Sequence, residues 1–462
     1  MIDKGSIPPL VSHRQLNPKI PALETDCMTI NTTLRPWKAS FRAICVNSYG
    51  AAGSNSAMLI CQPPQKSQRQ DKDRLEDLTY PISIGANSKG SLQRYIDMLD
   101  TQFRRSASNV GVGDLALSLS RRRKEHRFRL ITTLTKCEDL THIRGSAEKK
   151  IEEAPRDVKR VVLAFSGQSK QAFSIDEGLY KSCHIFRTYL DRCHQVIVGL
   201  GITQGLYPAI FQEGPFADTR ILQCSMFSMQ YAYAQTWISC GLQVDAVVGH
   251  SFGELTALAV SGILSLDDAM RLVETRAELM LSRWGSEPGT MLAIHDTAER
   301  VDEVLRSLPR EYAKPEIACY NNHSSHVVVS EEQSIEKIQE ILRTERGFTS
   351  IKSQRLDVTH GFHSKFTEGL LNDLGGVAKD LNFRSPNIHF ESCTSEELDV
   401  VSSAHIPEQT RKPVFFHQAI QRITDRLGSC FFLEAGVDTP VIGMVMRSVA
   451  DPKSHAFQAF RL

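Results

Sequence analysis

Short apolar runs alternate with segments of helical period along most of this chain, and this pattern predicts a mixed α/β protein. The run 244–248 is predicted as a short buried strand, and Leu255, Leu258 and Ala259 give the following segment a helical apolar period. The turn between them contains Gly-His-Ser-Phe-Gly, so Ser251 is expected at a sharp strand-to-helix elbow.

The two glycines of this turn allow the backbone to pass close to Ser251, because neither carries a Cβ atom. The start of a helix also offers unpaired backbone N–H groups. The N–H of Phe252 is the natural first donor to an oxyanion that develops on a substrate carbonyl. Ser251 is therefore the candidate nucleophile.

A second helix is predicted after the elbow, beginning with a capping-box pattern at 265–268. Its apolar residues recur at spacings of three and four: Ala269, Leu272, Val273, Leu279 and Met280. Arg276 lies within this apolar stripe, whereas the other charged residues point to the opposite face. An unpaired buried cation is costly, so Arg276 needs an anion. Either a structural carboxylate or a substrate carboxylate held by the guanidinium fork would meet that need.

Two histidines occur in the segment His360-Gly361-Phe362-His363, more than a hundred residues after Ser251. A general base must take the serine proton and return it to a leaving thiol, and a near-neutral imidazole suits both steps. On chemistry alone, either His360 or His363 could serve.

The segment 291–356 has the element order β-α-β-β-α-β, which is ferredoxin-like. Its strands are expected near 291–294, 316–319, 327–329 and 350–356, and its helices near 298–308 and 334–342. A cleft between this inserted subdomain and the larger core would bring Ser251, Arg276 and His363 together.

The composition excludes several classes of function. With 54 basic and 53 acidic residues the net charge is +1, so no global field attracts nucleic acid or an anionic membrane. The one dense basic run, 121–127, is expected to be a solvated helix end that could touch an acidic partner protein. The 11 cysteines include no C-x-x-C pair, and neither a signal peptide nor a membrane-length apolar run is evident. A cytoplasmic protein with reduced thiols and no bound metal or other cofactor is expected.

Residues 160–450 resemble malonyl-CoA:acyl carrier protein transacylase domains, most of all those of fungal iterative non-reducing polyketide synthases. The motifs that carry the resemblance are Phe165-Ser166-Gly167-Gln168, Gly249-His250-Ser251-Phe252-Gly253-Glu254, Arg276-Ala277-Glu278-Leu279-Met280, Tyr320-Asn321, His360-Gly361-Phe362-His363 and Phe432-Leu433-Glu434-Ala435-Gly436. The resemblance implies a hydrolase-like α/β acyltransferase core with an inserted ferredoxin-like subdomain.

The resemblance also implies a role for each candidate residue. Ser251 would be acylated, His363 would be its base, and Arg276 would bind the malonyl carboxylate. Gln168 would join the Phe252 N–H in the oxyanion hole. The remaining substrate contacts would be His250, Asn321, His360 and Phe362.

The four residues that end at His363 bear on the choice of acyl group. In related synthases His-Ala-Phe-His accompanies malonyl and Tyr-Ala-Ser-His accompanies methylmalonyl. A bulky Phe362 would crowd an α-methyl branch, which favours malonyl. Gly361 in place of alanine is expected to change little. A backbone carbonyl often orients the histidine in this family, and 436–438 is the candidate source of the orienting group.

The resemblance divides the chain into parts. Residues 1–62 resemble the last segment of a ketosynthase domain, 63–158 the small α/β linker between ketosynthase and acyltransferase, and 159–450 the acyltransferase, followed by a tail at 451–462. The stretch 65–74 is polar and is expected to be a flexible connector. The catalytic cysteine and histidines of a ketosynthase are not found in the first part, so no condensing activity is expected.

The sequence therefore predicts an acyltransferase that moves a malonyl group from malonyl-CoA, through a Ser251 ester, to the phosphopantetheine thiol of an acyl carrier protein supplied in trans. Other polyketide synthase domains are further candidate partners. Three alternatives stay open: a G-x-S-x-G thioesterase or esterase, a starter-unit acyltransferase, and a non-functional truncated synthase fragment, because Met1 falls within what resembles continuous synthase sequence.

Overall fold

The computed structural model describes residues 1–20, 23–63, 79–106, 111–120, 124, 126–136, 139–154, 158–168, 173–212, 214–216, 218–358, 360–436 and 439–460. The chain divides into two compact units, Met1–Glu76 and Asp77–Leu462. The predicted connector at 65–74 and much of the basic run at 121–127 lie outside the described residues.

The first unit consists of short strands and one 3-10 turn at Leu23–Asp26. Strands β1 (Ser6–Ile7) and β2 (Arg35–Pro36) pair with each other, and β3 (Ala43–Tyr49) and β4 (Asn55–Cys61) form an antiparallel hairpin. The turn of this hairpin lies at 50–54 and contains Gly50 and Gly53. Apolar side chains on the hairpin are exposed within the unit, among them Val46, Met58 and Leu59.

The second unit begins with a small α/β layer pair. Strands β5 (Tyr80–Ala86), β6 (Phe128–Leu134) and β7 (Glu152–Glu153) form an antiparallel sheet in the order β5-β6-β7. Its helices are α1 (Lys89–Ser106), α2 (Val112–Ser120) and α3 (Asp139–Lys150). Ile82, Leu92 and Leu130 are buried in its separate core. The apolar pattern of the sequence predicts strands near 81–84 and 128–134 and helices near 91–105 and 114–123, and β5, β6, α1 and α2 confirm them, whereas α3 was not predicted.

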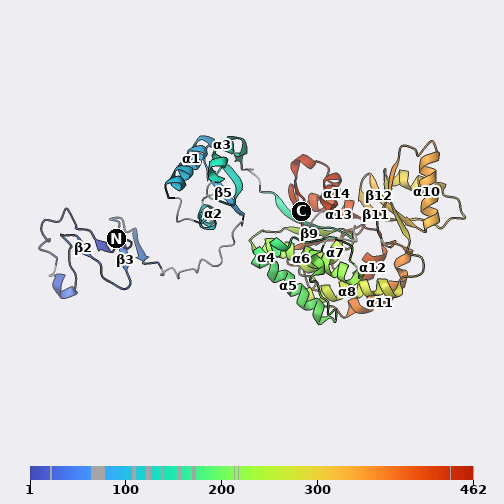
Figure 1. Ribbon diagram of the computed structural model, residues 1–462, viewed down its shortest axis with the longest axis horizontal. Coiled ribbons are helices and arrows are strands. Elements are labelled where there is room, and N and C mark those ends of the chain that lie inside the picture. The colour runs from blue at the N-terminus through green and yellow to red at the C-terminus, as the bar shows by residue number, and fades with distance from the viewer. Residues whose placement is uncertain are drawn as a thin grey trace. The chain divides into compact units, whose positions relative to one another are not determined.

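The largest sheet is parallel and has the order β14-β9-β8-β15-β16. Its strands are β8 (Arg160–Phe165), β9 (Ala246–Gly249), β14 (His389–Glu391), β15 (Cys430–Glu434) and β16 (Ala456–Gln458). The central strands are apolar on both faces, as expected of a parallel sheet covered by helices on both sides. Figure 1 shows α4 to α8 and α11 on one side of this sheet and α13 and α14 on the other.

The helices that cover the sheet are α4 (Glu177–Ser182), α5 (His184–Gly199), α6 (Thr219–Ser239), α7 (Gly253–Val260), α8 (Leu266–Arg283), α11 (Glu368–Lys379), α12 (His405–Arg411), α13 (Phe416–Leu427) and α14 (Val441–Ser448). Short 3-10 turns lie at Ala209–Phe211, Lys365–Thr367 and Pro452–Ser454. The predicted capping box is present at the start of α8, where the Ser265 Oγ accepts the backbone N–H of Asp268 at 3.1 Å.

The inserted subdomain has the elements β10 (Thr290–His295), α9 (Ala298–Ser307), β11 (Glu316–Asn322), β12 (Ser325–Ser330), α10 (Glu332–Thr344) and β13 (Lys352–Arg355). Its antiparallel sheet has the order β11-β12-β10-β13, which is the ferredoxin-like arrangement. The predicted element order and fold class are confirmed.

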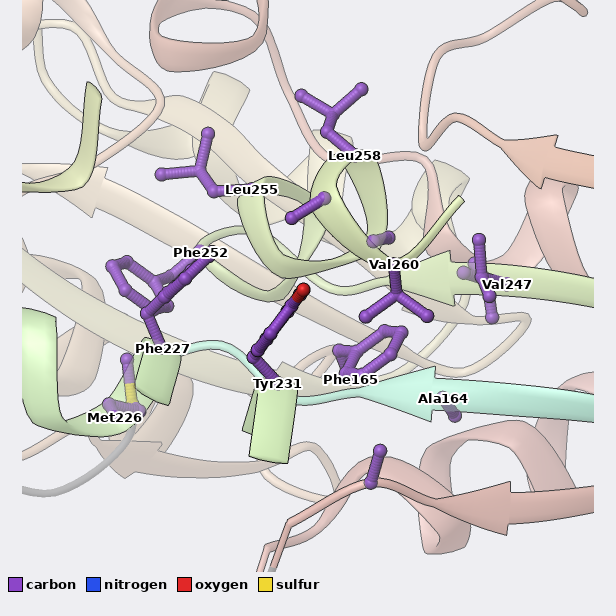
Figure 2. Close-up of a cluster of buried hydrophobic side chains, with 14 of the residues drawn as sticks. Ala164, Phe165, Met226, Phe227, Tyr231, Val247, Phe252, Leu255, Leu258 and Val260 are labelled. Carbon is purple, nitrogen blue, oxygen red and sulfur yellow. The ribbon is translucent and has the colours of Figure 1, made fainter. Parts of the chain in front are cut away.

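A dense apolar core supports the elbow that follows β9. Figure 2 shows Phe165 of β8 together with Phe227 and Tyr231 of α6, packed around α7 and its residues Leu255 and Leu258. Because these side chains come from β8, α6 and α7, the start of α7 is fixed against both the sheet and α6.

The close packing at the start of α7 predicts a large effect of adding one methyl group. A Cβ atom at Gly253 would overlap the backbone of Phe165, which cannot move without displacing β8. We expect Gly253→Ala to lower the free energy of unfolding by about 3 kcal/mol. The matched control is Gly376→Ala in α11, where a Cβ meets no atom within 4 Å, and where a gain of about 0.5 to 1 kcal/mol is expected. Urea denaturation measures the free energy of unfolding of both variants. Equal stabilities of Gly253→Ala and Gly376→Ala would contradict this prediction.

Candidate active site

Ser251 lies at the turn between β9 and α7 with a backbone φ of 53°, in the left-handed region that non-glycine residues seldom adopt. The flanking contacts are close, because a Cβ at Gly249 would overlap the backbone of Gly253 and Glu254. This is the strained strand-to-helix elbow that the sequence predicted, and it raises the serine side chain above the sheet.

The Ser251 Oγ lies 2.7 Å from the Nε2 of His363. His363 follows β13 in a loop, has a φ of 57° and is 3 % exposed. Both partners of this hydrogen bond therefore adopt the left-handed backbone conformation, which is held by the surrounding structure. Of the two histidines in the segment, only His363 makes this contact.

Two backbone carbonyls orient His363. Its Nδ1 lies 3.0 Å from the carbonyl oxygen of Gln409 and 3.1 Å from that of Lys412, at the end of α12. A carbonyl can only accept, so Nδ1 carries the proton and Nε2 is left to accept the serine hydroxyl. The prediction that 436–438 supplies the orienting group is wrong, and residues 437 and 438 lie outside the described residues.

Burial keeps the His363 imidazole neutral. Removal from water is the main cause, and the neighbouring His250 and Arg276 add to it; together they lower the pKa of His363 from its ordinary value to about 3. A neutral imidazole is the form that can accept the Ser251 proton.

Helix α12 is fixed to the elbow by two contacts. A buried pair joins His405 Nε2 to Glu254 Oε1 at 2.6 Å, and Glu254 also accepts the backbone N–H of Cys393. The Gln409 Nε2 donates to the carbonyl oxygen of Ser251 at 2.9 Å. These contacts tie the carbonyls that orient His363 to the same turn that carries Ser251.

Two donors are available for an oxyanion. The Phe252 N–H, at the start of α7, makes no hydrogen bond with a described residue. Gln168, in the segment after β8, lines the same cavity as Ser251, and its Oε1 accepts from Gln223 Nε2 at 3.0 Å. The Nε2 of Gln168 has no hydrogen-bond partner among the described residues.

Arg276 is 8 % exposed, in the buried face of α8 as the sequence predicted. Its Nη1 donates to Gln223 Oε1 at 2.7 Å, and its guanidinium lies 5.1 Å from the ring centre of Phe362. No carboxylate of the described residues forms an ion pair with it. Burial lowers the pKa of Arg276 to about 10, so it remains a cation at neutral pH. The structural carboxylate that the sequence left open is not found in the described part of the chain.

His360 and Phe362 lie against Trp284 at the end of α8, with ring centres 4.4 and 5.6 Å from that of the indole. Burial, with a contribution from Arg276, lowers the pKa of His360. Gly361 is closely surrounded by neighbouring side chains. A Cβ there would lie 2.7 Å from a methyl group of Val329 and under 3 Å from the ring of Phe366, so the glycine permits the packing of this loop on β12.

His250 and Asn321 form a second polar pair. The His250 Nε2 lies 2.8 Å from Asn321 Oδ1, and burial lowers the pKa of His250. Since Asn321 lies at the end of β11, this hydrogen bond connects the elbow to the ferredoxin-like subdomain.

A cavity of about 190 Å³ opens beside Ser251, between the core and the subdomain. Its polar lining includes Ser166, Gln168, His250, Ser251, Asn321, Asp357 and His363. The other walls are mainly apolar: Met291, Ala293, Val327, Leu356, Val358, Phe362, Val441 and Met444. Arg276 and His360 do not line it; each lies against Phe362, which does.

The structure thus places Gln168, His250, Ser251, Asn321, Phe362 and His363 around one cavity, whereas Arg276 and His360 contact Phe362 without lining it. Two further residues, Gln223 and Gln409, were missed. Gln223 is a polar residue buried in α6, and a buried glutamine in an apolar helix is a signal that could have found it. Within the described ranges, no group of three or more His, Cys, Asp or Glu side chains is arranged to hold a metal ion.

The chain matches known families over most of its length. Residues 162–442 match the family described as acyl transferase domain, and 17–131 match the ketoacyl-synthetase C-terminal extension. The non-reducing polyketide synthase atr1 of Stereocaulon alpinum is 44% identical over 99% of this chain and 18% of its own length. The synthase stbA of Stachybotrys bisbyi is 41% identical over 99% of this chain and 21% of its own length. The chain therefore spans about a fifth of these relatives.

Solved structures share the fold. The acyltransferase domain from module 8 of the salinomycin polyketide synthase superposes with a TM-score of 0.70 at 21% identity, over 83% of this chain and 91% of that domain. Malonyl CoA-acyl carrier protein transacylase from Clostridium perfringens superposes with a TM-score of 0.58 at 22% identity, over 66% of this chain and 93% of that protein.

The elbow, the histidine pairing and these matches lead to one assignment: the chain belongs to the acyl transferase domain family, in the form found in polyketide synthases. The predicted ketosynthase-associated segment at the N-terminal side is confirmed by the match over 17–131. None of the helices in the described ranges combines the length and apolar character needed to cross a membrane.

Proposed function

We propose that this acyltransferase moves a malonyl group from malonyl-CoA to the phosphopantetheine thiol of an acyl carrier protein, through an ester on Ser251. The observation that carries this proposal is the buried Arg276 cation, which has no carboxylate partner among the described residues and lies against Phe362, a wall of the cavity that contains the serine-histidine pair. Such a cation is suited to the free carboxylate of a malonyl group.

In the first step, His363 Nε2 takes the Ser251 proton as Oγ bonds to the thioester carbonyl carbon. The negative charge that develops on the carbonyl oxygen is stabilised by the Phe252 N–H and by the Gln168 amide. The carbon–sulfur bond then breaks, and His363 gives its proton to the departing coenzyme A thiolate. The product is malonyl-Ser251.

In the second step, His363 removes the proton of the carrier phosphopantetheine thiol, and the sulfur attacks the ester carbonyl. The same donors stabilise the new oxyanion. The carbon–oxygen bond breaks, and the proton returns from His363 to Ser251 Oγ. His363 therefore acts as base and acid in turn while the carbonyls of Gln409 and Lys412 hold its tautomer.

The choice of acyl group is assigned to the region around Phe362. Its ring lines the cavity and contacts the Arg276 guanidinium, so an α-methyl branch on the acyl group would press against it. His360 supports this ring from the side of Trp284. His250 and Asn321 are assigned to the wall that faces the entering thioester.

The proposed transferase occupies 159–450, with its ferredoxin-like subdomain at 291–356. Residues 1–62, 63–158 and 451–462 are assigned to a ketosynthase tail, a linker domain and a tail after the acyltransferase. The acceptor is a holo acyl carrier protein, and other polyketide synthase domains are further candidate partners.

The mass of the intact protein after brief incubation with malonyl-CoA tests this proposal, with acetyl-CoA and Ser251→Ala in parallel. We expect a malonyl adduct that forms faster than an acetyl adduct and is absent from Ser251→Ala. A folded protein that gains no malonyl adduct, or an adduct that persists in Ser251→Ala, would refute the proposal.

The pH dependence of acylation follows from the state of His363. Its pKa is lowered to about 3, so the base is neutral from pH 8 down to pH 5 and loses activity only as the pH falls toward that value. We therefore expect the rate of Ser251 acylation to be flat over this range. Single-turnover acylation measures the rate, and tryptophan fluorescence at each pH controls for acid unfolding. A titration near the ordinary histidine value of about 6.5 in folded protein would contradict the expectation.

A further inference from the structure

Among the described residues, Gln223 is the one polar side chain that is hydrogen-bonded to both Arg276 and Gln168. It lies in α6 and is fully buried among apolar neighbours. Its Oε1 accepts from Arg276 Nη1 at 2.7 Å, and its Nε2 donates to Gln168 Oε1 at 3.0 Å. A buried amide is costly unless both of its ends are paired, and here both ends are used.

The cation fixes the direction of this chain of hydrogen bonds. A guanidinium can only donate, so the Gln223 atom that faces Arg276 must be the oxygen. The Gln223 NH2 group then faces Gln168, whose oxygen must accept from it. That leaves the Gln168 NH2 group as the end without a partner among the described residues. Gln168 also lines the cavity beside Ser251, so its donor end is the one available to an oxyanion.

The absence of a charge on Gln223 is as important for the state of Arg276 as its hydrogen bonds are. A carboxylate at this position would form a buried ion pair with Arg276, at the 2.7 Å separation that the amide oxygen now has. Arg276 would then have its anion within the protein. The amide satisfies one N–H of the guanidinium and leaves the positive charge uncompensated.

We propose that Gln223 is a positioning residue for this site: it holds Gln168 with its donor end toward the oxyanion, and it keeps Arg276 charged and unpaired for the carboxylate of the acyl group. This inference rests on the proposed malonyl transfer and deepens it. One connected set of hydrogen bonds therefore positions the groups that bind the acid end of the acyl group and its reacting carbonyl.

The test compares Gln223→Glu with the parent in single-turnover acylation by malonyl-CoA and by acetyl-CoA. The matched control is Gln230→Glu, an isosteric change at a second buried glutamine of α6. Gln230 is hydrogen-bonded to Ser166 and Thr256 and makes no hydrogen bond with Arg276. Both variants place a carboxylate in the same helix, so both are expected to lose stability.

The ratio of malonyl to acetyl acylation separates a role in positioning from a loss of stability. For Gln223→Glu we expect this ratio to fall by about tenfold or more, because Arg276 is neutralised. For Gln230→Glu we expect the two rates to change together and the ratio to stay near that of the parent. An unchanged ratio in Gln223→Glu would overturn the inference.

A second variant covers the case in which Gln223→Glu does not fold. Gln223→Met keeps the volume, leaves Arg276 unpaired and removes the anchor of Gln168. We expect it to slow acylation by both donors by about tenfold, through kcat rather than KM, because the oxyanion donor is no longer held. Parent rates in folded Gln223→Met would overturn the inference. Failure of the proposed function would be seen separately, as a parent protein that forms no malonyl ester on Ser251.

Discussion

Replacement of His363 by alanine is expected to slow acylation of Ser251 by about 10³-fold or more. The Ser251 hydroxyl is hydrogen-bonded to His363 Nε2, and the described residues place no second imidazole within hydrogen-bond distance of Oγ. Without this base the serine must lose its proton to water. Stopped reactions analysed by intact-protein mass give the rate with malonyl-CoA and with acetyl-CoA, and both are expected to fall equally.

The matched control for this variant is His295→Ala, at the exposed end of β10. It should acylate at the parent rate. A rate for His363→Ala within tenfold of the parent, in protein with a parent-like unfolding transition, would show that His363 is not the base.

Replacement of Arg276 by alanine is expected to lower the preference for malonyl-CoA over acetyl-CoA by about 100-fold. The buried guanidinium has no ion-pair partner among the described residues, and a substrate carboxylate would be its only anion there. Acetyl transfer does not use this charge, so acylation by acetyl-CoA should fall much less than acylation by malonyl-CoA. The ratio of the two acylation rates measures the effect.

Two variants sharpen this test. Arg271→Ala removes an exposed arginine of the same helix, paired at 3.5 Å with Asp380, and should leave the ratio unchanged. Arg276→Lys keeps the charge but loses the planar fork, so an intermediate ratio is expected. Equal ratios in Arg276→Ala and the parent would remove Arg276 from the proposed recognition of malonyl.

The parts of the fold that depend on local pattern could be predicted from the sequence. The elbow at Ser251 follows from an apolar strand, small turn residues and a helical period. The start of α8 at Ser265 follows from its cap. The ferredoxin-like subdomain follows from the order of its strands and helices. Helix α3 was missed, because it has only a weak apolar stripe and several of its residues are charged.

The parts of the site that depend on backbone atoms could not be predicted. His363 is oriented by the carbonyls of Gln409 and Lys412, and a carbonyl belongs to every residue type, so no side chain in the sequence marks it. The close packing around Gly361 could not be predicted for a related reason. The sequence shows a missing methyl group, whereas only the tertiary packing shows that Val329 and Phe366 occupy the space.

The partner of Arg276 illustrates the limit of a helical pattern. The spacing of apolar residues placed Arg276 on the buried face of the helix correctly. A helical-wheel projection cannot show whether a neighbouring helix supplies a carboxylate or an amide to it. The structure shows an amide, that of Gln223 in α6. This difference changes the interpretation of the site, because an arginine already paired with a carboxylate of the protein would bind an acidic substrate only weakly.

The fate of the malonyl group on Ser251 tests the central claim most directly. Malonyl-enzyme formed with malonyl-CoA and freed of coenzyme A is mixed with holo acyl carrier protein, with the apo form, or with buffer, and all proteins are followed by intact mass. Transfer through Ser251 predicts that the malonyl group appears on the holo carrier protein alone, far faster than the ester is lost in buffer. Loss of the ester at one rate in all three mixtures, with no malonyl carrier protein, would show hydrolysis and contradict the proposed transferase.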